Sequence, residues 1–462
     1  MEQLIMAETI LNNLSRLVLG KFQEEMPSEE LALAKLALLD YLGVTMLGSR
    51  ELSVNILLSY KLKYFTKGTT GTHQIIGKNV KLNQLDAVEF NGSSAHALDY
   101  DDTGASTQCH PSALLFPALI SISEDHNISG KKLLKSYIIG VEMLNVLSKC
   151  LPFLHSNGWH PSSVFGPLAS AVSSSLLLDS SEKQLANSLG IAASLSGGLV
   201  ANFGSQTKHL HIGNASASGL KAALLGKGGF TSSEFILEGP KSYFAAYGKN
   251  DICLQDFLPG FGDPWSIKTP GLNFKQYASC ALSHRLIDIA IDLKRKNDIS
   301  PSEITGVSCR ATPRAKEILF YQDPEEGLQG KFSIHYLIAR ALIYGEIKTV
   351  DFTIEAVNDP KVKNLMKLIS FEVHEDWDDS GNLWRPDVLQ IDLADGNQLE
   401  GVSTYPKGHA KNPFEWDIVQ QKFIDCSEWA LSRKSISNVI SLVGTFEDID
   451  DSSQILKSLQ VE

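Results

Sequence analysis

Residues 163–225 constrain the fold more than any other part of this 462-residue chain, because Ala, Gly, Ser and Leu dominate them. Small side chains let helix backbones approach one another closely. The composition alone would also suit a low-complexity linker, but the regular Leu and Ile positions indicate helices. We therefore expect a compact all-helical body in which buried helices surround a central one.

Several segments carry the signals that begin a helix. Ser28 is expected to cap an apolar helix that ends at Gly48, and Ser129 and Ser181 precede further apolar runs. Pro111 stands where a helix can start, since the missing N–H of proline is spared in the first turn. These signals predict that the first part of the chain is helical.

The pattern changes near residue 265, where Asp263-Pro264 and Thr269-Pro270 interrupt regular structure. Mixed elements follow: a helix over 282–296, short strands over 304–309 and 369–373, a hairpin at Asp395-Gly396 and a last helix over 416–426. The sequence predicts a mainly α fold. It has a large all-helical domain of residues 1–265 plus 410–462 and a smaller α+β lid domain of residues 266–409.

The net charge of the protein limits the kinds of molecule that it is expected to bind. The formal net charge is -12, and a surface of that sign repels nucleic acid and anionic lipid. We see no run of about 18 uncharged apolar residues, so we expect no membrane span. The first residues lack the features of a signal peptide, which favours a cytoplasmic location. An acidic chain that binds a small anion needs a local group of Lys, Arg and His.

The cysteines and histidines give little support to a metal site. The six cysteines are scattered and form no CxxC pair, which favours reduced thiols over a disulfide framework, a zinc finger or an iron–sulfur site. No HExxH spacing occurs, and the one HxH, at His209 and His211, lies beside a lysine. Metal binding by Asp and His is therefore the minority interpretation.

The densest polar segment covers residues 96–103, and His110 follows it closely. Three carboxylates within four residues, those of Asp99, Asp101 and Asp102, are costly together unless they are solvated or paired. One interpretation is an exposed acidic turn that caps the following helix. The others are a metal site and a catalytic group.

Three further segments gather polar groups. His160 precedes a proline at the start of a helix, where a solvent-facing imidazole is the alternative. Lys208 lies in the basic run 207–211, where a carboxylate could sit on the ammonium group and the helix N-terminus, although a solvated loop is equally compatible. Lys275 and Cys280 follow the domain change and could face a cleft, unless the thiol is a buried filler.

The order of these segments resembles the MmgE/PrpD family. HALDYDDT, HP, GWHP, TKHLHIGNA, KxYxxC and KFSIHY occur in the family's order, and the match runs from about Leu36 to about Phe423. The resemblance implies a large helical domain with a small α+β lid, homodimers, and no required metal or organic cofactor. It also implies a small di- or tricarboxylate as the partner.

The family includes 2-methylcitrate dehydratase, cis-aconitate decarboxylase and iminodisuccinate epimerase activities. We expect a lyase that eliminates water after proton abstraction next to a carboxylate. Epimerisation and decarboxylation are the alternatives, and a non-catalytic scaffold ranks last. Cys280 stands where the animal decarboxylase has a histidine, and this departure favours the dehydratase and epimerase branches.

The resemblance also implies the site residues. The catalytic set is His110, Cys280, Asp99 and His160, and the substrate-binding set is Thr103, Lys208, Lys275 and Tyr336. His110 is the preferred general acid or base, since its ordinary pKa lies near neutrality, and Asp99 would orient an imidazole. Cations beside the substrate would stabilise developing negative charge. Because the motifs flank residue 265, we expect the site in a cleft between body and lid.

Overall fold

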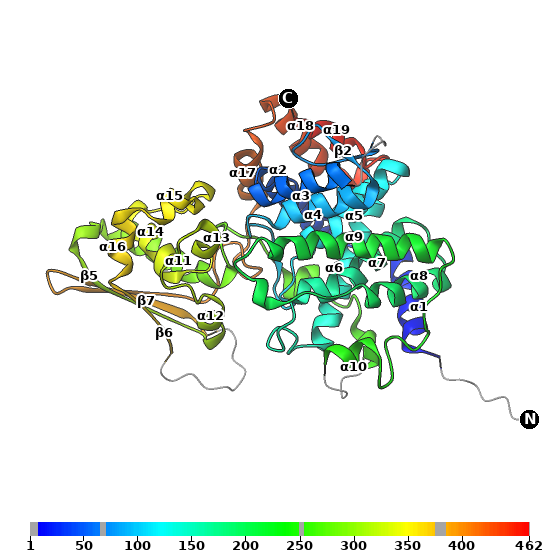
Figure 1. The fold of residues 1–462 in the computed structure, drawn as a ribbon, viewed down its shortest axis with the longest axis horizontal. Helices are drawn as coiled ribbons and strands as arrows, with labels where there is room; N and C mark the ends of the chain where they lie inside the picture. The colour runs from blue at the N-terminus through cyan, green and yellow to red at the C-terminus, as the bar shows by residue number, and fades with distance from the viewer. Residues whose placement is uncertain (1–7, 65–70, 249–253, 375–384, 462) are drawn as a thin grey trace, which may run out of the picture. The chain divides into compact units, whose positions relative to one another are not determined.

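The computed structural model describes residues 8–64, 71–248, 254–374 and 385–461 (Figure 1). The chain divides into two compact units. The helical unit comprises Met1–Ala97, Asp101–Phe274 and Glu415–Glu462, and the second unit comprises Leu98–Tyr100 and Lys275–Phe414. Helices dominate the described residues and the strands form only small sheets, which confirms the predicted mainly α fold class.

The helical unit is built from helices with two short strand pairs. The helices are α1 (Ile10–Gln23), α2 (Ser28–Gly48), α3 (Leu52–Tyr64), α4 (Gln84–His96), α5 (Pro111–Asp125), α6 (Gly130–Cys150), α7 (Pro161–Leu177), α8 (Glu182–Ser194), α9 (Thr207–Lys227), α10 (Tyr243–Tyr247), α17 (Trp416–Ser427), α18 (Arg433–Gly444) and α19 (Gln454–Ser458). The antiparallel pairs are β1 (His73–Gln74) with β2 (Lys81–Leu82), and β3 (Thr103–Gly104) with β4 (Leu272–Asn273).

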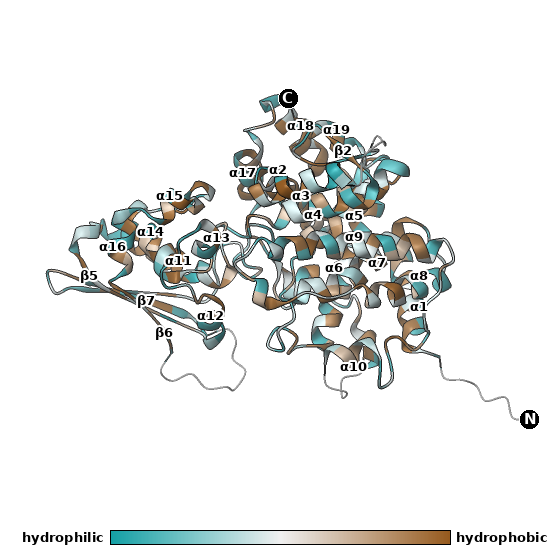
Figure 2. Cartoon of the chain, viewed as in Figure 1, coloured by the Kyte–Doolittle hydropathy of each residue, from teal (hydrophilic) through white to brown (hydrophobic). Residues whose placement is uncertain are grey.

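Helix α7 is the centre of this unit. All of its residues are buried, and it packs against α5, α6, α8 and α9. Figure 2 shows hydrophobic residues recurring along the helices, with hydrophilic residues between them. The small-residue stretch therefore forms buried helices around a central one, as predicted, and the linker alternative is wrong.

The predicted helix starts are mostly confirmed. The Ser129 and Ser181 side chains accept hydrogen bonds from backbone N–H groups of α6 and α8, and Pro111 opens α5. The cap assigned to Ser28 is wrong, because Pro27 occupies the cap position and Ser28 is already helical. Proline fits there since its fixed φ matches the extended backbone before the first turn.

Helix α2 is long and apolar enough to suit a membrane span by length and composition alone, although it contains charged residues such as Lys35 and Asp40. Of its most apolar window, 72% is buried within the protein, as in a core helix. Asp40 on α2 pairs with Lys422 on α17 at 2.7 Å, and both side chains are buried. The C-terminal segment thus returns to the helical unit.

Helices α4 and α9 approach each other at two glycines. A Cβ atom on Gly92 would lie 2.9 Å from the Gly213 Cα, and a Cβ atom on Gly213 would lie 2.1 Å from the Glu89 carbonyl oxygen. Neither position has room for a side chain. His96 lies one turn beyond Gly92, and Lys208 lies in the first turn of α9, so this close packing fixes how near these two side chains come.

The second unit packs helices on a four-stranded sheet of order β6-β5-β7-β8. Strands β5 and β6 are parallel and the other neighbours are antiparallel. The strands are β5 (Ile304–Ala311), β6 (Ile369–Val373), β7 (Asp387–Leu393) and β8 (Gln398–Ser403). The helices are α11 (His284–Asn297), α12 (Pro313–Ile318), α13 (Gly327–Gly330), α14 (Ile334–Tyr344), α15 (Ile354–Val357) and α16 (Pro360–Met366).

Burial alternates along β5, β6 and β7, and α11 and α14 pack against the sheet (Figure 1). Burial of every second residue is the mark of a sheet with one covered face. The predicted strands and the hairpin at Asp395-Gly396 are confirmed, because β7 and β8 pair on either side of that turn.

We predict that Gly213→Ala destabilises the helical unit. The new methyl group would overlap the Glu89 carbonyl oxygen, and overpacking of this kind costs about 1–3 kcal/mol. The measurement is the midpoint of urea unfolding monitored by circular dichroism. Gly20→Ala is the matched control. Gly20 is an exposed position of α1 with no neighbour within 4 Å, so the free energy of unfolding should stay equal or rise by up to about 1 kcal/mol. Equal behaviour of the two variants would contradict the close contact.

Candidate active site

Four buried side chains form a hydrogen-bonded chain in the helical unit. The Lys208 Nζ lies 2.9 Å from the His96 Nε2, and the His96 Nδ1 lies 2.9 Å from the Asp101 Oδ1. The Asp101 Oδ2 lies 3.2 Å from the His110 Nδ1. Three segments of the fold supply these groups: the C-terminal end of α4 with the turn after it, the N-terminus of α5, and the first turn of α9.

The protonation of His110 is set by its partners. Its Nδ1 lies 3.0 Å from the Asp102 carbonyl oxygen, in addition to the Asp101 carboxylate. Both partners are acceptors, so Nδ1 carries the hydrogen and Nε2 is the basic nitrogen of the ring. The His110 backbone N–H donates to the Ser162 Oγ at 3.2 Å, which ties this residue to α7.

Asp101 and His96 are both buried, and their surroundings give the two side chains different charge states. Burial and the nearby Lys208 ammonium lower the pKa of His96 to about 3, although Asp101 opposes this shift. Burial favours the neutral form of Asp101, yet the imidazoles of His96 and His110 hold the pKa of this carboxyl well below its usual range. This hydrogen-bonded chain therefore combines the neutral imidazole of His96 with the ionised carboxylate of Asp101.

Asp102 holds the loop that ends at His110. Its Oδ1 accepts from the Ser112 backbone N–H at 3.1 Å, and its Oδ2 accepts from the Ser112 Oγ at 2.7 Å. Burial and the nearby Asp40 raise the pKa of Asp102 to about 8. All three carboxylates of the acidic segment are buried, so the exposed-turn interpretation is wrong. The capping role in that interpretation is confirmed, because Asp102 accepts a hydrogen bond from a backbone N–H in the first turn of α5.

The basic segment and His160 are also buried rather than solvated. His160 precedes α7, and its Nδ1 lies 3.1 Å from the His211 Nδ1. Burial, together with the neighbouring Lys208 charge, lowers the pKa of His160 well below its usual range. Lys208 and His209 are buried residues in the first turn of α9. The solvent-facing imidazole and the solvated loop are therefore both wrong.

Thr103 has a simpler setting. It is half-buried in β3, and its Oγ1 accepts a 3.4 Å hydrogen bond from the Asn273 side chain. The helical unit thus holds Thr103, His110, His160 and Lys208 of the predicted residues.

In the second unit, two buried lysines bind the segment Leu98–Tyr100. The Lys275 Nζ donates to the carbonyl oxygen and the Oδ1 of Asp99, both at 2.8 Å. The Lys331 Nζ donates to the Leu98 carbonyl at 2.6 Å and to the Ala278 carbonyl at 2.7 Å. Asp99 has a positive φ of 52°. The carboxylate between the imidazoles of the helical unit is that of Asp101, whereas Asp99 accepts from Lys275.

Cys280 is half-buried, so it is not the fully buried filler that the alternative required. Its backbone N–H donates to the Lys331 carbonyl at 3.1 Å. Burial lowers the pKa of Arg314, and the Cys280 thiol opposes that shift, so an arginine faces the cysteine. Tyr336 is fully buried in the core of this unit, and its hydroxyl donates to the Asp351 carbonyl, which makes its role structural.

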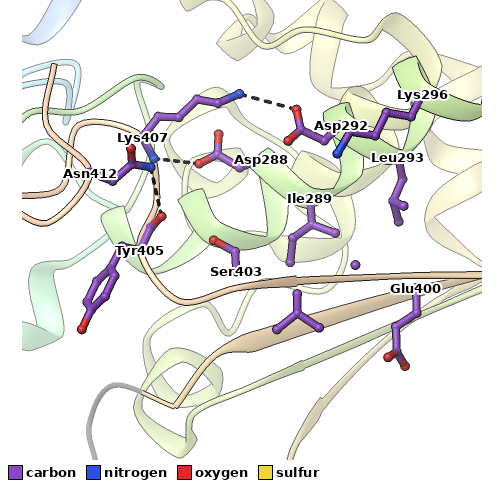
Figure 3. Close-up of a pocket in the computed structure, with 12 residues that line it drawn as sticks. Asp288, Ile289, Asp292, Leu293, Lys296, Glu400, Ser403, Tyr405, Lys407 and Asn412 are labelled. Carbon is purple, nitrogen blue, oxygen red and sulfur yellow. Dashed lines mark hydrogen bonds and ion pairs between the residues drawn. The ribbon is translucent and has the colours of Figure 1, made fainter. Parts of the chain in front are cut away.

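The second unit also contains a polar groove of about 260 Å³ (Figure 3). Figure 3 shows Lys407 beside Asp288 and Asp292, and the Lys407 backbone N–H donates to Asp288 at 2.9 Å. None of the predicted site residues is among the described residues that line it. This hydrogen bond holds the segment after β8 against α11. The convergence of the two groups of predicted residues in one cleft stays a prediction.

Sequence reasoning assigned no role to His96, Asp101 or Lys331. All three lie inside the segments HALDYDDT and KFSIHY, so the signal was present. His96, Asp101 and His110 are ligand-type side chains, and they gather in the helical unit. The Lys208 ammonium at the His96 Nε2, and the imidazole N–H groups at Asp101, join them in a hydrogen-bonded chain.

Comparisons with known proteins agree with this arrangement of motifs. Residues 12–254 match the MmgE/PrpD N-terminal domain, and residues 277–445 match the MmgE/PrpD C-terminal domain. Cis-aconitate decarboxylase of Mus musculus is 27% identical over 446 residues, which cover 92% of this chain and 88% of that protein. The Homo sapiens protein of the same name is 26% identical over 441 residues, covering 92% and 89%.

A third relative is fungal. The cis-aconitate decarboxylase of Aspergillus terreus (strain NIH 2624 / FGSC A1156) is 24% identical over 464 residues, which cover 94% of this chain and 93% of that protein. Since the two domain models together account for most of the sequence, in the order expected from its motifs, the chain belongs to the MmgE/PrpD family.

Proposed function

We propose that this protein is a lyase that acts on a small tricarboxylate through a carbanion next to a carboxylate. The chain from Lys208 through His96 and Asp101 to His110 carries the proposal, because it joins a buried cation to a basic imidazole. The relatives named cis-aconitate decarboxylase support a tricarboxylate as the substrate.

Charge is the reason why this arrangement suits such a reaction. A carbanion beside a carboxylate spreads negative charge onto the carboxylate oxygens. A fixed ammonium group such as that of Lys208 stabilises this charge more in the transition state than in the bound substrate. The Asp101 carboxylate in turn stabilises the imidazolium that forms when His110 takes a proton.

Decarboxylation is the first candidate reaction, because the relatives carry that name. The bond between a carbon and its carboxylate breaks, CO₂ leaves, and the electron pair stays on the carbon. The His110 imidazolium then delivers a proton to that carbon. The names of the relatives support this reaction more than the elimination that the sequence motifs favoured.

Loss of water is the second candidate, favoured by the cysteine at position 280. Here His110 would remove a proton from the carbon next to a carboxylate, and the hydroxyl on the neighbouring carbon would leave as water after protonation by an acid. The half-buried Cys280 thiol is the candidate acid. Two-base epimerisation would use the same pair without net loss of a group.

A substrate panel tests the proposal. Purified protein is incubated in D₂O with cis-aconitate, 2-methylcitrate, citrate and iminodisuccinate, and CO₂ release, alkene formation and deuterium exchange are measured. We expect turnover of a tricarboxylate with loss of CO₂ or water. Exchange without net turnover would indicate an epimerase, and neither turnover nor exchange with any of the four would contradict the proposal.

We predict that His110→Asn lowers kcat on the active substrate about 10²–10⁴-fold, the usual contribution of a general acid or base. The melting temperature should change little, because the amide nitrogen of asparagine takes the place of Nδ1 and keeps the donor to Asp101. His126→Ala is the control, since this exposed histidine lies at the other end of the same helix and should leave kcat unchanged. A His110→Asn protein with normal kcat would remove His110 from the reaction.

Cys280→Ser separates the two candidate reactions. The variant keeps the size of the side chain but replaces the thiol with a far weaker acid. We expect decarboxylation of cis-aconitate to continue at a similar rate, because His110 alone supplies the proton. A loss of about 10²–10⁴-fold would instead make Cys280 a catalytic acid and would favour loss of water or epimerisation.

A further inference from the structure

His96 is the most enclosed member of the chain in the helical unit. Its side chain is 0% exposed, and its ring lies 4.2 Å from that of His110, centroid to centroid. Each ring nitrogen faces a charged group: Nε2 lies 2.9 Å from the Lys208 Nζ, and Nδ1 lies 2.9 and 3.0 Å from the two Asp101 oxygens. A histidine whose only role was to fill space would not need a cation at one ring nitrogen and an anion at the other.

Donor and acceptor types leave one arrangement of hydrogens. A lysine ammonium has donors only, so the His96 Nε2 must accept. An ionised carboxylate accepts only, so the His96 Nδ1 must donate to Asp101. His96 is thereby a neutral imidazole with its hydrogen on Nδ1. In this form it accepts from a cation and donates to an anion at the same time.

We propose that His96 is a positioning residue that stays neutral and couples Lys208 to Asp101, so that carboxylate binding at Lys208 and the acid–base state of His110 depend on each other. The inference rests on the proposed function for the roles of Lys208 and His110. It adds a residue that has no role of its own with the substrate.

The charge at His110 responds to its titratable neighbours. Within the helical unit these include Asp101, His96 and His160, and Asp102 presents its backbone carbonyl. The Asp101 carboxylate forms an ion pair with His110 and also accepts from His96. A change in the hydrogen bonds to Asp101 should therefore change the pKa of His110.

Two substitutions split the two contacts of His96. The amide nitrogen of asparagine takes the place of Nδ1, so His96→Asn keeps the donor to Asp101 and loses the acceptor for Lys208. The amide oxygen of glutamine takes the place of Nε2, so His96→Gln keeps the acceptor for Lys208 and loses the donor to Asp101. The two variants should then fail in different ways.

For His96→Gln we expect the limb of the kcat/KM profile that His110 controls to move up by about one pH unit. With one donor fewer, the Asp101 charge favours the His110 imidazolium. This is the alkaline limb in decarboxylation, where His110 is the acid, and the acidic limb in loss of water, where His110 is the base. For His96→Asn we expect an unmoved limb and a KM raised about tenfold, as for a lost hydrogen bond to a charged group. A histidine that only fills the core would give equal losses in both variants and no movement of the limb.

His73→Gln is the matched control. His73 is buried and pairs with Asp125 at 3.0 Å, and Asp125 ends α5 about 20 Å from His110. This variant should show the same cost of removing a buried imidazole but an unmoved pH profile.

Nitrogen NMR of protein labelled at histidine tests the inference without any turnover. We expect the His96 signals, assigned by their loss in the variants, to stay those of a neutral ring with hydrogen on Nδ1 between about pH 5 and 9. We also expect His110 to titrate at higher pH in His96→Gln than in the native protein. A protonated His96 at neutral pH, or an unmoved His110, would overturn the inference even if the substrate panel succeeds. An inactive protein that shows both signals would overturn only the proposed function.

Discussion

The geometry of the candidate site depends on the close approach of α4 and α9. Gly92 and Gly213 leave no space for a side chain between the two helices. Helices normally pack with side chains between their axes, so glycine at the contact brings the backbones nearer than usual. One turn away, His96 and Lys208 lie within hydrogen-bond distance of each other. A larger residue at either glycine would separate the helices and, with them, the first two members of the chain.

Burial of charge is the second constraint. A lysine or a carboxylate inside a protein is costly unless a partner offsets the lost hydration. In the helical unit, the hydrogen-bonded chain from Lys208 to His110 gives each buried charged group a hydrogen-bond partner. The Asp40–Lys422 pair between α2 and α17 does the same for two further buried charges. In the second unit, Lys275 is compensated by Asp99. The acidic surface of the protein therefore coexists with cations in its interior.

Local sequence signals predicted the helices of the fold well, but they did not predict which polar residues of the site contact one another. Caps at Ser129 and Ser181 and the small-residue stretch gave helices directly, because each depends on neighbours in sequence. The role of the acidic segment could not be inferred this way. Its three carboxylates look alike in sequence, and only packing decides that Asp101 faces two imidazoles while Asp102 caps α5. His96 received no role because its partner Lys208 lies 112 residues away in the sequence and only the packing of α4 against α9 brings them together.

The segment Leu98–Tyr100 has a consequence for how this protein could have evolved. It belongs to the second unit, while the residues on either side belong to the helical unit. The second unit is therefore assembled from separate stretches of the gene. An exchange of residues 275–414 with a relative would bring in Lys275 and Lys331 without the segment that they bind. The contacts to backbone carbonyls could form with any residues at positions 98 and 99, but the ion pair of Lys275 needs a carboxylate at position 99. Such an exchange would therefore leave a buried lysine without its counter-charge in any acceptor that lacks this aspartate.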